Sequence, residues 1–194
     1  EKENFLSTID SEGKRMSRLI DDMLLLSQAD AHAFPIRLQP VECDTLLLNS
    51  FETFEPMAKE KNISFTVSLP RTALPPCLSD GERLSQVIAI LLHNAISYTP
   101  SGGSISLTLS SNSTKKPEAL TLSIADNGIG IPDEEKDKIF QRFYRSDRSR
   151  SVKNHFGLGL PIASEIIRSL DGTIRVVDTP GGGSTFLVRL PFRS

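Results

Sequence analysis

Five short segments that alternate apolar and polar residues restrict the possible folds of this sequence more than any other feature. A period of two is typical of strands with one buried face. The segments are Ile63–Leu69, Ser104–Ser110, Leu120–Ile124, Thr173–Val177 and Thr185–Leu190. Helical periodicity marks three further segments: Thr45–Lys61, Asp80–Tyr98 and Leu158–Leu170. Because strands and helices do not alternate strictly, we expect an α+β fold, a two-layer α/β sandwich whose mixed sheet is covered by about three helices.

The amino-terminal part of the sequence has the pattern of one long amphipathic helix. Its stripe has steps of three and four residues and consists of the apolar Leu6, Ile9, Met16, Ile20 and Met23, with Gly13 and Ser27 at the remaining steps. The heptad-like spacing favours a helical bundle or coiled coil, and docking on the chain's own domain is the alternative. Pro35 and Pro40 then break the periodicity. We therefore expect this helix over 1–31, a linker over 32–40 and the main domain over 41–194.

Composition excludes several classes of function. The 194 residues suffice for one mid-sized domain and a smaller part, and the net charge of −2 argues against nucleic-acid binding. Cys43 and Cys77 are too few for a metal cluster or a disulfide framework, which favours a reducing cytoplasm. No apolar run approaches the roughly 20 residues that cross a bilayer. We expect any contact with a membrane to be made by segments upstream of this sequence.

The segment Asp80–Tyr98 carries the clearest helical pattern. Ser79 and Glu82 have the spacing of a capping box, and Thr99-Pro100 ends the helix. Away from the buried stripe, a second face presents Ile90, Asn94, Ser97 and Tyr98. An amide and an aromatic ring thus lie side by side, although Asn94 taken alone is compatible with an ordinary surface residue.

A first glycine cluster, Asp126–Ile131, directly follows a predicted strand. Alternate glycines allow a sharp turn and a close approach of the backbone to a ligand. At the strand end, the carboxylate of Asp126 is an acceptor for an exocyclic amine such as that of adenine. A plain turn at Asn127-Gly128 remains the alternative.

A second glycine cluster, His155–Pro161, precedes the last predicted helix. Gly157 and Gly159 would expose backbone N–H groups at the amino terminus of this helix, which is a favourable site for phosphate. Neither cluster completes a P-loop or the dinucleotide-binding motif. The nucleotide folds that carry those motifs are therefore disfavoured.

Between the glycine clusters lies an aromatic and basic stretch. The spacing of Phe140 and Phe143 predicts a short anchored helix, and the polar segment Ser146–Asn154 predicts a lid over a ligand. Cations that would attract polyphosphate occur throughout this stretch: Arg142, Arg145, Arg148, Arg150 and Lys153. A solvated charged loop is the alternative.

Together these segments resemble the ATP-binding catalytic domain of sensor histidine kinases, a Bergerat fold shared with gyrase, a heat-shock chaperone family and mismatch-repair ATPases. The similarity extends from about Pro40 to the end and follows the family's order of sequence boxes. These are an N box at His93–Thr99, a G1 box at Asp126–Ile131, an F box at Phe140–Tyr144, a G2 box at Gly157–Leu160 and a terminal glycine-threonine element at Gly183–Phe186.

The resemblance implies roles for individual residues. Asn94 would coordinate Mg2+, Asp126 would bind the adenine amine, Tyr98 would pack near the base, and Arg145 would meet the terminal phosphates, so Asn94 and Arg145 are the candidate catalytic residues. The pocket would be shaped by Gly128, Gly130, Gly157 and Gly159. Leu158 and Leu160 would hold the hinge of the lid, and further nucleotide contacts are expected from Ile131, Phe143 and Thr185.

The first segment also resembles a part of these kinases, the second helix of the dimerisation and phosphoacceptor hairpin, over Asn4–Ala31. The acceptor histidine lies on the first helix of that hairpin, and His32, His93 and His155 lack its sequence context. We therefore expect a portion of a longer chain that binds ATP or ADP but cannot phosphorylate itself in cis. The resemblance implies a homodimer through the hairpin, transfer of the γ-phosphate to a histidine, and relay to a response-regulator receiver domain. It also implies the cytoplasmic part of a membrane-anchored bacterial sensor.

Three positions depart from the family pattern. Ile90 stands where the N box often has its first asparagine, Ser97 where a phosphate-binding lysine is common, and His155 where the G2 box often has glycine. The first two departures leave open a degenerate ATP-binding module that regulates a partner through its conformation. A third reading, a Bergerat ATPase outside signalling, is disfavoured because such relatives have an acidic general base where Ile90 is apolar.

Overall fold

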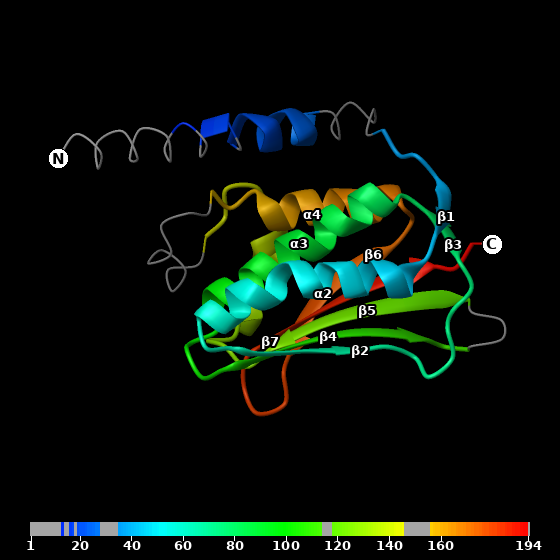
Figure 1. Ribbon diagram of the computed structural model, residues 1–194. Coiled ribbons are helices and arrows are strands. Elements are labelled where there is room, and N and C mark those ends of the chain that lie inside the picture. Colours follow the sequence, from blue (N-terminus) through cyan, green and yellow to red (C-terminus); the bar gives the residue numbers. More distant parts are fainter. Residues whose placement is uncertain are drawn as a thin grey trace.

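The computed structural model describes residues 13, 16–17, 19–27, 35–113, 118–145 and 156–193. Its main element is a five-stranded sheet with the strand order β2-β4-β5-β7-β6. The strands are β2 (Ser64–Ser68), β4 (Ser104–Ser111), β5 (Ala119–Asp126), β6 (Thr173–Asp178) and β7 (Ser184–Pro191). β2 pairs with β4 in parallel and all other neighbours are antiparallel, so the prediction of a mixed sheet is confirmed (Figure 1).

One face of this sheet is covered by α2 (Cys43–Glu60), α3 (Gly81–Tyr98) and α4 (Gly159–Ser169), as Figure 1 shows. Each helix turns an apolar stripe towards the strands. The stripe of α3 consists of Leu84, Val87, Ile88, Leu91, Leu92, Ala95 and Ile96. The predicted two-layer α/β sandwich is therefore confirmed, and the bounds of its helices differ from the predicted ones by two residues or fewer.

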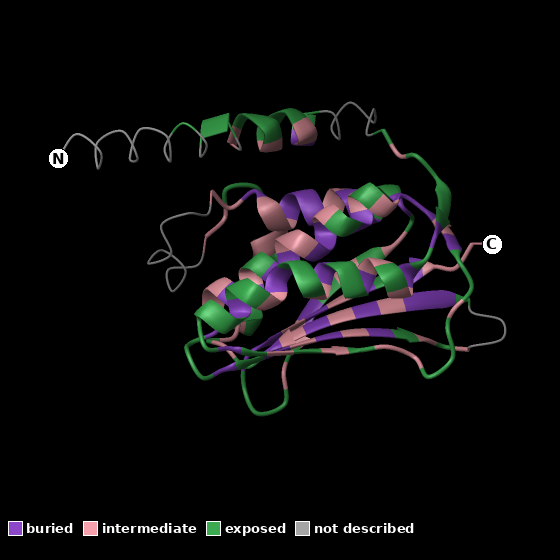
Figure 2. Cartoon of the chain, in the orientation of Figure 1, coloured by how far each residue is buried: buried purple, intermediate pink, exposed green. Residues whose placement is uncertain are grey.

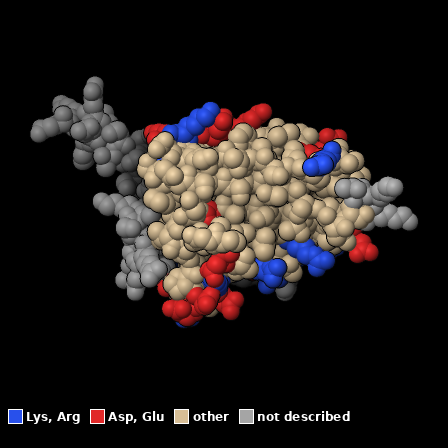
Figure 3. All heavy atoms as spheres, turned by 90° about the horizontal axis from the view of Figure 1, so that it is seen from below, with Lys and Arg blue, Asp and Glu red and all other residues tan. Residues whose placement is uncertain are grey.

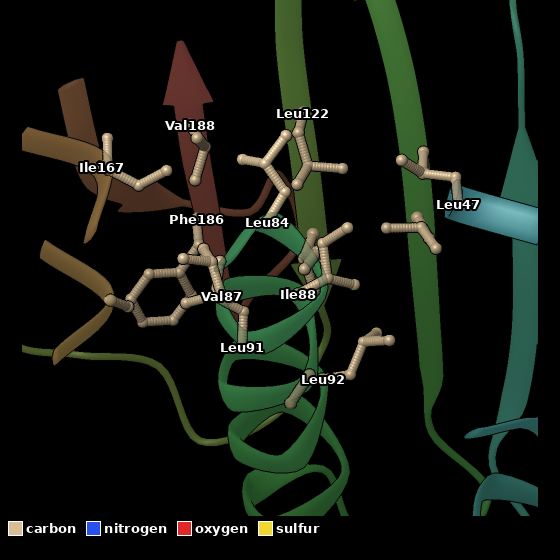
Figure 4. Packing of buried hydrophobic residues seen from close by; sticks show 14 of the residues in the cluster. Leu47, Leu84, Val87, Ile88, Leu91, Leu92, Leu122, Ile167, Phe186 and Val188 are labelled. Atoms are coloured by element: carbon tan, nitrogen blue, oxygen red, sulfur yellow. The ribbon is translucent and has the colours of Figure 1, made fainter. Parts of the chain in front are cut away.

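The core lies between the helical layer and the sheet, where buried residues from both layers face each other (Figure 2). In Figure 4, Leu84 and Val87 of α3 lie among Leu122 of β5 and Val188 and Phe186 of β7. Complete burial of one such side chain stabilises the fold by about 1.5–3 kcal/mol. This packing fixes α3 against β5 and β7, the elements that carry the predicted N box, G1 box and terminal element.

The opposite face of the sheet carries short hydroxyl side chains. Successive residues of a strand point to opposite sides, so Leu107 and Leu109 face the helices whereas Ser106 and Thr108 face away. Figure 3 views the molecule from this side, where the charged side chains lie mainly towards the margins. The helices thus cover one face of the sheet, and the other is polar and largely uncharged.

A second sheet, which the sequence analysis did not predict, joins β1 (Gln39–Val41) and β3 (Cys77–Ser79) in antiparallel pairing. Val41 lies opposite Cys77, and this pairing brings the Sγ atoms of Cys43 and Cys77 within 3.7 Å. The hydrogen bond to Cys77 and burial raise the pKa of the Cys43 thiol above its ordinary value. This small sheet anchors the chain where it enters the main domain.

The amino-terminal cap of α3 differs from the predicted one. Asp80 is the N-cap, and its Oδ1 accepts the N–H of Arg83 at 3.1 Å. Its Oδ2 accepts the N–H of Arg37 at 2.8 Å. The predicted capping box of Ser79 and Glu82 is wrong, because pairing with β1 holds Ser79 in an extended strand.

Residues 19–27 form a helix ahead of the main domain, as predicted. Leu26 is 3% exposed and belongs to the core cluster. Met16, Ile20 and Met23 of the predicted stripe are 62%, 55% and 49% exposed. Much of the predicted helix over 1–31 lies outside the described residues. Among the helices that are described, none has the length and hydropathy needed to span a bilayer.

Candidate nucleotide-binding site

Asp126 ends β5 and is only 5% exposed. Its Oδ1 accepts the N–H of Gly128 at 2.8 Å and that of Ser184 at 3.3 Å. Burial raises the pKa of Asp126, and these two hydrogen bonds oppose the rise. Within the part of the chain that the structure describes, both hydrogen bonds fall on Oδ1, so Oδ2 remains as an acceptor for a ligand N–H.

The turn after Asp126 lies tightly against the end of α3. A Cβ added to Gly128 would lie 2.4 Å from the carbonyl oxygen of Tyr98, so only glycine fits there. The N–H of Ile129 donates to the same oxygen at 3.4 Å. Tyr98 is the last residue of α3 and is half-buried. The structure thus brings together the three predicted residues Tyr98, Asp126 and Gly128.

The start of β7 contacts the same turn from another side. Gly183 has a φ of +99°, and a Cβ built on it would lie 2.0 Å from the carbonyl oxygen of Asp126. The predicted pocket residue Gly130 has a φ of +70°, and its Cβ would lie 3.6 Å from the carbonyl oxygen of Gly183. The two glycine-containing elements are therefore in direct contact at the end of β5.

Thr185 is not brought to this site. It lies opposite Ala125 in the sheet, and its Oγ1 shares a hydrogen bond with Oγ1 of Thr179 at 2.8 Å. Because neighbouring strand residues alternate in direction, Ser184 points to the side of Asp126 and Thr185 to the other. Ser184, which sequence reasoning missed, contacts Asp126 through its backbone N–H, so the donor does not depend on the serine side chain. The available signal was that Ser184 shares a strand face with the apolar Phe186, which is 4% exposed.

Asn127 was also given no role of its own by the sequence analysis. Its Oδ1 accepts the N–H of Ser104 at 2.7 Å, and its own N–H donates to the carbonyl oxygen of Ser104 at 3.2 Å. These two hydrogen bonds fasten the turn after Asp126 to the start of β4. Asn127-Gly128 indicated a turn, but no local pattern indicated these hydrogen bonds, because Ser104 lies 23 residues away in the sequence.

The predicted metal ligand Asn94 lies on α3, one turn before Tyr98, and is half-buried. Ile90 precedes it by four residues and therefore shares its helix face. A Cβ on Gly159, the first residue of α4, would lie 3.2 Å from Cγ2 of Ile90. The face of α3 that carries Asn94 is thus adjacent to the amino terminus of α4, whose first N–H groups lack helical partners.

The predicted F and G2 boxes contact each other directly. The N–H of Phe143 donates to the carbonyl oxygen of Gly157 at 3.0 Å. Gly157 has a φ of +73°, and its Cβ would lie 2.7 Å from the carbonyl oxygen of Tyr144. Arg145 follows at a half-buried position. The predicted lid, with its cations and His155, lies within residues 146–155, outside the described part of the chain.

The two phenylalanines of the F box have different environments. Phe140 ends η2 (Lys138–Phe140), and its ring centroid lies 6.4 Å from that of Phe186. Phe143 is 59% exposed and has a φ of +62°. The prediction that both rings anchor the short helix is therefore wrong for Phe143, because the left-handed backbone there turns the side chain away from the core.

The remaining predicted residues are apolar and belong to the two glycine clusters. Leu158 caps α4 and is 1% exposed. Leu160 and Ile131 are half-buried and pack against the core cluster. Leu158 and Leu160 thus pack the start of α4 against the core, and Ile131 does the same for the end of the G1 box.

The donor set also fits a magnesium ion bound together with polyphosphate. Mg2+ prefers oxygen ligands and usually takes only one or two from the protein when phosphates are present. Asn94 offers an amide oxygen, and no group of three or more His, Cys, Asp or Glu in the described ranges could hold a metal ion alone. A metal at this site would therefore depend on phosphate oxygens for most of its coordination.

Comparison with known protein families agrees with this geometry. The family described as "Histidine kinase-, DNA gyrase B-, and HSP90-like ATPase" matches residues 79–194. This chain belongs to that family. The match contains α3, both glycine clusters and β7, so every box that the histidine kinase resemblance rests on falls inside it.

Within this family, the chain is most informatively compared with sensor kinases. It is 34% identical over 193 residues to the sensor histidine kinase WalK of Bacillus subtilis, which covers 97% of this chain and 30% of WalK. It is 36% identical over 176 residues to the adaptive-response sensory kinase SasA of Microcystis aeruginosa, which covers 91% of this chain and 44% of SasA. The crystal structure of full-length ShkA in complex with AMPPNP matches with a TM-score of 0.86 at 28% identity, over 98% of this chain and 39% of ShkA.

These matches confirm the prediction that the chain is an ATP-binding portion of the sensor histidine kinase type. The chain spans less than half the length of each of these relatives.

Proposed function

We propose that this chain is the catalytic portion of a sensor histidine kinase, which binds Mg-ATP and transfers its γ-phosphate to a histidine of the parent protein. The observation that carries the proposal is Asp126, a buried strand-end carboxylate whose Oδ1 is held by two backbone N–H groups. Its other oxygen is thereby directed to accept a hydrogen bond from the 6-amino group of adenine.

The adenine end of the site recognises the base. Asp126 accepts from the amine, and the half-buried ring of Tyr98 packs beside the base. Gly128 lets the backbone turn come close enough to cover the base, because any Cβ there would overlap with Tyr98. Apolar packing by Ile131 excludes water from this end of the pocket.

The phosphate end of the site supplies positive charge and orientation. The free N–H groups at the amino terminus of α4 face the polyphosphate, and Arg145 binds the terminal phosphates. Asn94 gives an oxygen ligand to Mg2+, which when bound neutralises the charge that accumulates on the phosphates. In phosphoryl transfer the protein acts mainly by positioning and electrostatic stabilisation, and these groups provide both.

The same proposal assigns the rest of the chain. Residues 1–31 form the second helix of the dimerisation hairpin, 32–40 the linker and 41–194 the catalytic domain. Exposure of Met16, Ile20 and Met23 on the amino-terminal helix supports pairing with a second copy through this stripe. The phosphate is relayed from the histidine to the aspartate of a response-regulator receiver domain, and upstream segments anchor the parent protein in a membrane.

A degenerate nucleotide-binding module is the second candidate function. The specific observation in its favour is that the apolar Ile90 lies beside the start of α4, where a Cβ on Gly159 would be 3.2 Å from its Cγ2 and where a polar side chain would face the phosphates. Such a module would bind ADP or ATP and signal by conformation without turnover.

Replacement of Asp126 by asparagine tests the nucleotide site directly. Titration calorimetry with Mg-ADP is expected to show a loss of about 1–3 kcal/mol in Asp126→Asn, the cost of an unmatched buried hydrogen-bonding partner. Asp137→Asn, an exposed aspartate in the same region, is the matched control and should bind like the unmodified chain. Equal affinities in the two variants would remove Asp126 from the site.

Phosphotransfer distinguishes the two candidate functions. The parent chain with its acceptor helix, incubated with Mg2+ and ATP labelled at the γ-phosphate, is expected to acquire acid-labile, base-stable phosphate. Binding of nucleotide without any transfer would favour the regulatory module. Label that survives acid would indicate serine or threonine chemistry instead.

A further inference from the structure

The last turn of α3 has carbonyl groups that the helix itself cannot satisfy. The chain leaves the helix at Thr99, whose N–H and Oγ1 both bind the carbonyl oxygen of Ala95, at 3.0 and 2.7 Å. Pro100 has no N–H and so cannot bind the carbonyl of Ile96, as the next helical residue would. The carbonyls of Ile96, Ser97 and Thr99 therefore need donors from elsewhere.

Lys61, which follows α2, supplies these donors. Its Nζ lies 2.6 Å from the carbonyl oxygen of Ile96, 3.2 Å from that of Ser97 and 3.3 Å from that of Thr99. An ammonium group has three N–H donors, so this set occupies all of them. α3 has no basic residue in its last turn, and Lys61 is thus a cation placed at the negative end of its dipole.

The backbone beside Lys61 is itself fixed. The carbonyl oxygen of Asn62 accepts the N–H of Gly102 at 2.8 Å, and the N–H of Ser64 donates to the carbonyl of Gly103 at 2.9 Å. The end of α2 is therefore fastened to the segment that follows α3. The ammonium of Lys61 consequently approaches the three carbonyls from an anchored position.

The turn held by Lys61 borders the nucleotide site. Tyr98 lies between the carbonyls of Ser97 and Thr99, and its own carbonyl oxygen accepts the N–H of Ile129. A Cβ on Gly128 would overlap with that same oxygen at 2.4 Å. A displacement of this turn therefore moves both the ring of Tyr98 and the turn that follows Asp126.

We propose that Lys61 is a positioning residue for adenine recognition, which holds Tyr98 and the turn after Asp126 in the geometry that the base requires. This inference rests on the proposed function. Lys61 acts through backbone carbonyls and not on phosphate, since its donors are already engaged. It therefore does not replace the lysine whose usual N-box position is taken here by Ser97.

The test compares four variants by calorimetric titration with Mg-ADP and Mg-GDP and by thermal unfolding. Lys61→Met keeps the length of the side chain and removes its donors, and Lys61→Arg keeps the cation. Lys59→Met removes an exposed lysine of α2 that pairs with Glu55. Leu109→Val trims a buried side chain of β4 and serves as a control for lower stability without a change at the site.

Lys61→Met is expected to raise the Kd for ADP about tenfold, the scale of one lost charge-assisted hydrogen bond, and to reduce the preference for ADP over GDP. The preference should fall because guanine lacks the 6-amino group that Asp126 recognises, so it depends on the geometry that Lys61 holds. Lys61→Arg should restore most of the preference. Lys59→Met should match the unmodified chain, and Leu109→Val should lower Tm with unchanged preference.

A general loss of stability cannot imitate this pattern, because it reduces the folded fraction equally for both nucleotides. If Lys61→Met lowers Tm but keeps the Kd for ADP and the preference of the unmodified chain, the inference is overturned and Lys61 is a structural cap only. If Lys61→Met does not fold, Lys61→Gln, which retains two N–H donors, should show an intermediate loss of preference. Absence of ADP binding by the unmodified chain would overturn the proposed function, and this inference with it.

Discussion

The two ends of the α/β sandwich are held together by different kinds of contact. At one end, Asp126, Gly128 and Gly183 bring backbone against backbone, and two backbone N–H groups hold Oδ1 of Asp126. At the other end, Cys43 lies among apolar side chains such as Leu47, Leu109 and Leu120, which line a small cavity. The first end depends on close backbone contacts that also fix polar atoms, and the second depends on apolar burial. A substitution at the apolar end should therefore change folding without changing binding, whereas one at the first end can change both.

The largest effect is expected from Gly183→Ala. The new Cβ would lie 2.0 Å from the carbonyl oxygen of Asp126, and the φ of +99° strains any L side chain. We expect a loss of about 4 kcal/mol or more in the free energy of unfolding, measured by urea denaturation. Gly181→Ala is the matched control, because its φ is +91° with nothing within 4 Å, and it should lose only about 1 kcal/mol. Similar losses would show that the close contact at Gly183 can relax.

A core truncation at the apolar end should affect folding alone. Leu120→Ala, at a residue only 2% exposed, is expected to lower the free energy of unfolding by about 2–4 kcal/mol through lost burial and a new cavity. The Kd for Mg-ADP should stay within about twofold of the original at a temperature where the protein remains folded, since distant sites are nearly additive. A large change in that Kd would show that packing at the apolar end also controls nucleotide binding at the other end.

Adenine binding should weaken on acidification. Because burial raises the pKa of Asp126, its carboxylate becomes protonated at a higher pH than an ordinary aspartate. The Kd for Mg-ADP is therefore expected to rise as pH falls through this raised pKa, and Asp126→Asn should flatten the profile. In the nucleotide-free protein the sign is opposite, because the folded state holds this proton more tightly than the unfolded state. The free energy of unfolding should fall as pH rises from about 3.8 through the raised pKa.

The smallest effect is expected from restoring a polar residue beside α4. Ile90→Asn should lower the Kd for Mg-ADP by about threefold, the scale of a weak net hydrogen bond, while costing about 1 kcal/mol of stability. The comparison is titration with and without Mg2+, and the gain should appear only with the metal. A gain that is independent of Mg2+ would argue against a metal-binding role for this face of α3.

Much of the layered fold could be predicted from the sequence, because each strand and helix of the main sheet carries its own periodic pattern. β1 and β3 could not, since each has three residues and is defined only by pairing with the other. The pairing of Gln39 with Ser79 also explains the misplaced cap of α3. The periodic pattern within a segment predicted its secondary structure. The sequence did not show which short, distant segments pair with each other.

The residues of the candidate site show the same difference between local features, which were predicted, and distant contacts, which were not. Asp126, Gly128 and Tyr98 were predicted, because a strand end, a glycine turn and a helix end are local features. The alternation of β7 placed Ser184 on the face of Phe186, but its contact with Asp126 depends on the register of β7 against β5, which no local pattern gives. Lys61 was missed for a similar reason, since its three acceptors lie 35 to 38 residues away in the sequence.

Asp80 has a mechanical consequence for the whole chain. One carboxylate oxygen holds the N–H of Arg37, where the polypeptide enters the domain, and the other holds the first turn of the helix that carries Asn94. A twist or pull applied ahead of β1 therefore reaches α3 by two routes, the side chain of Asp80 and the pairing of β1 with β3. Of the two, the Asp80 contact lies nearer to the incoming segment, so it would bear such a force first.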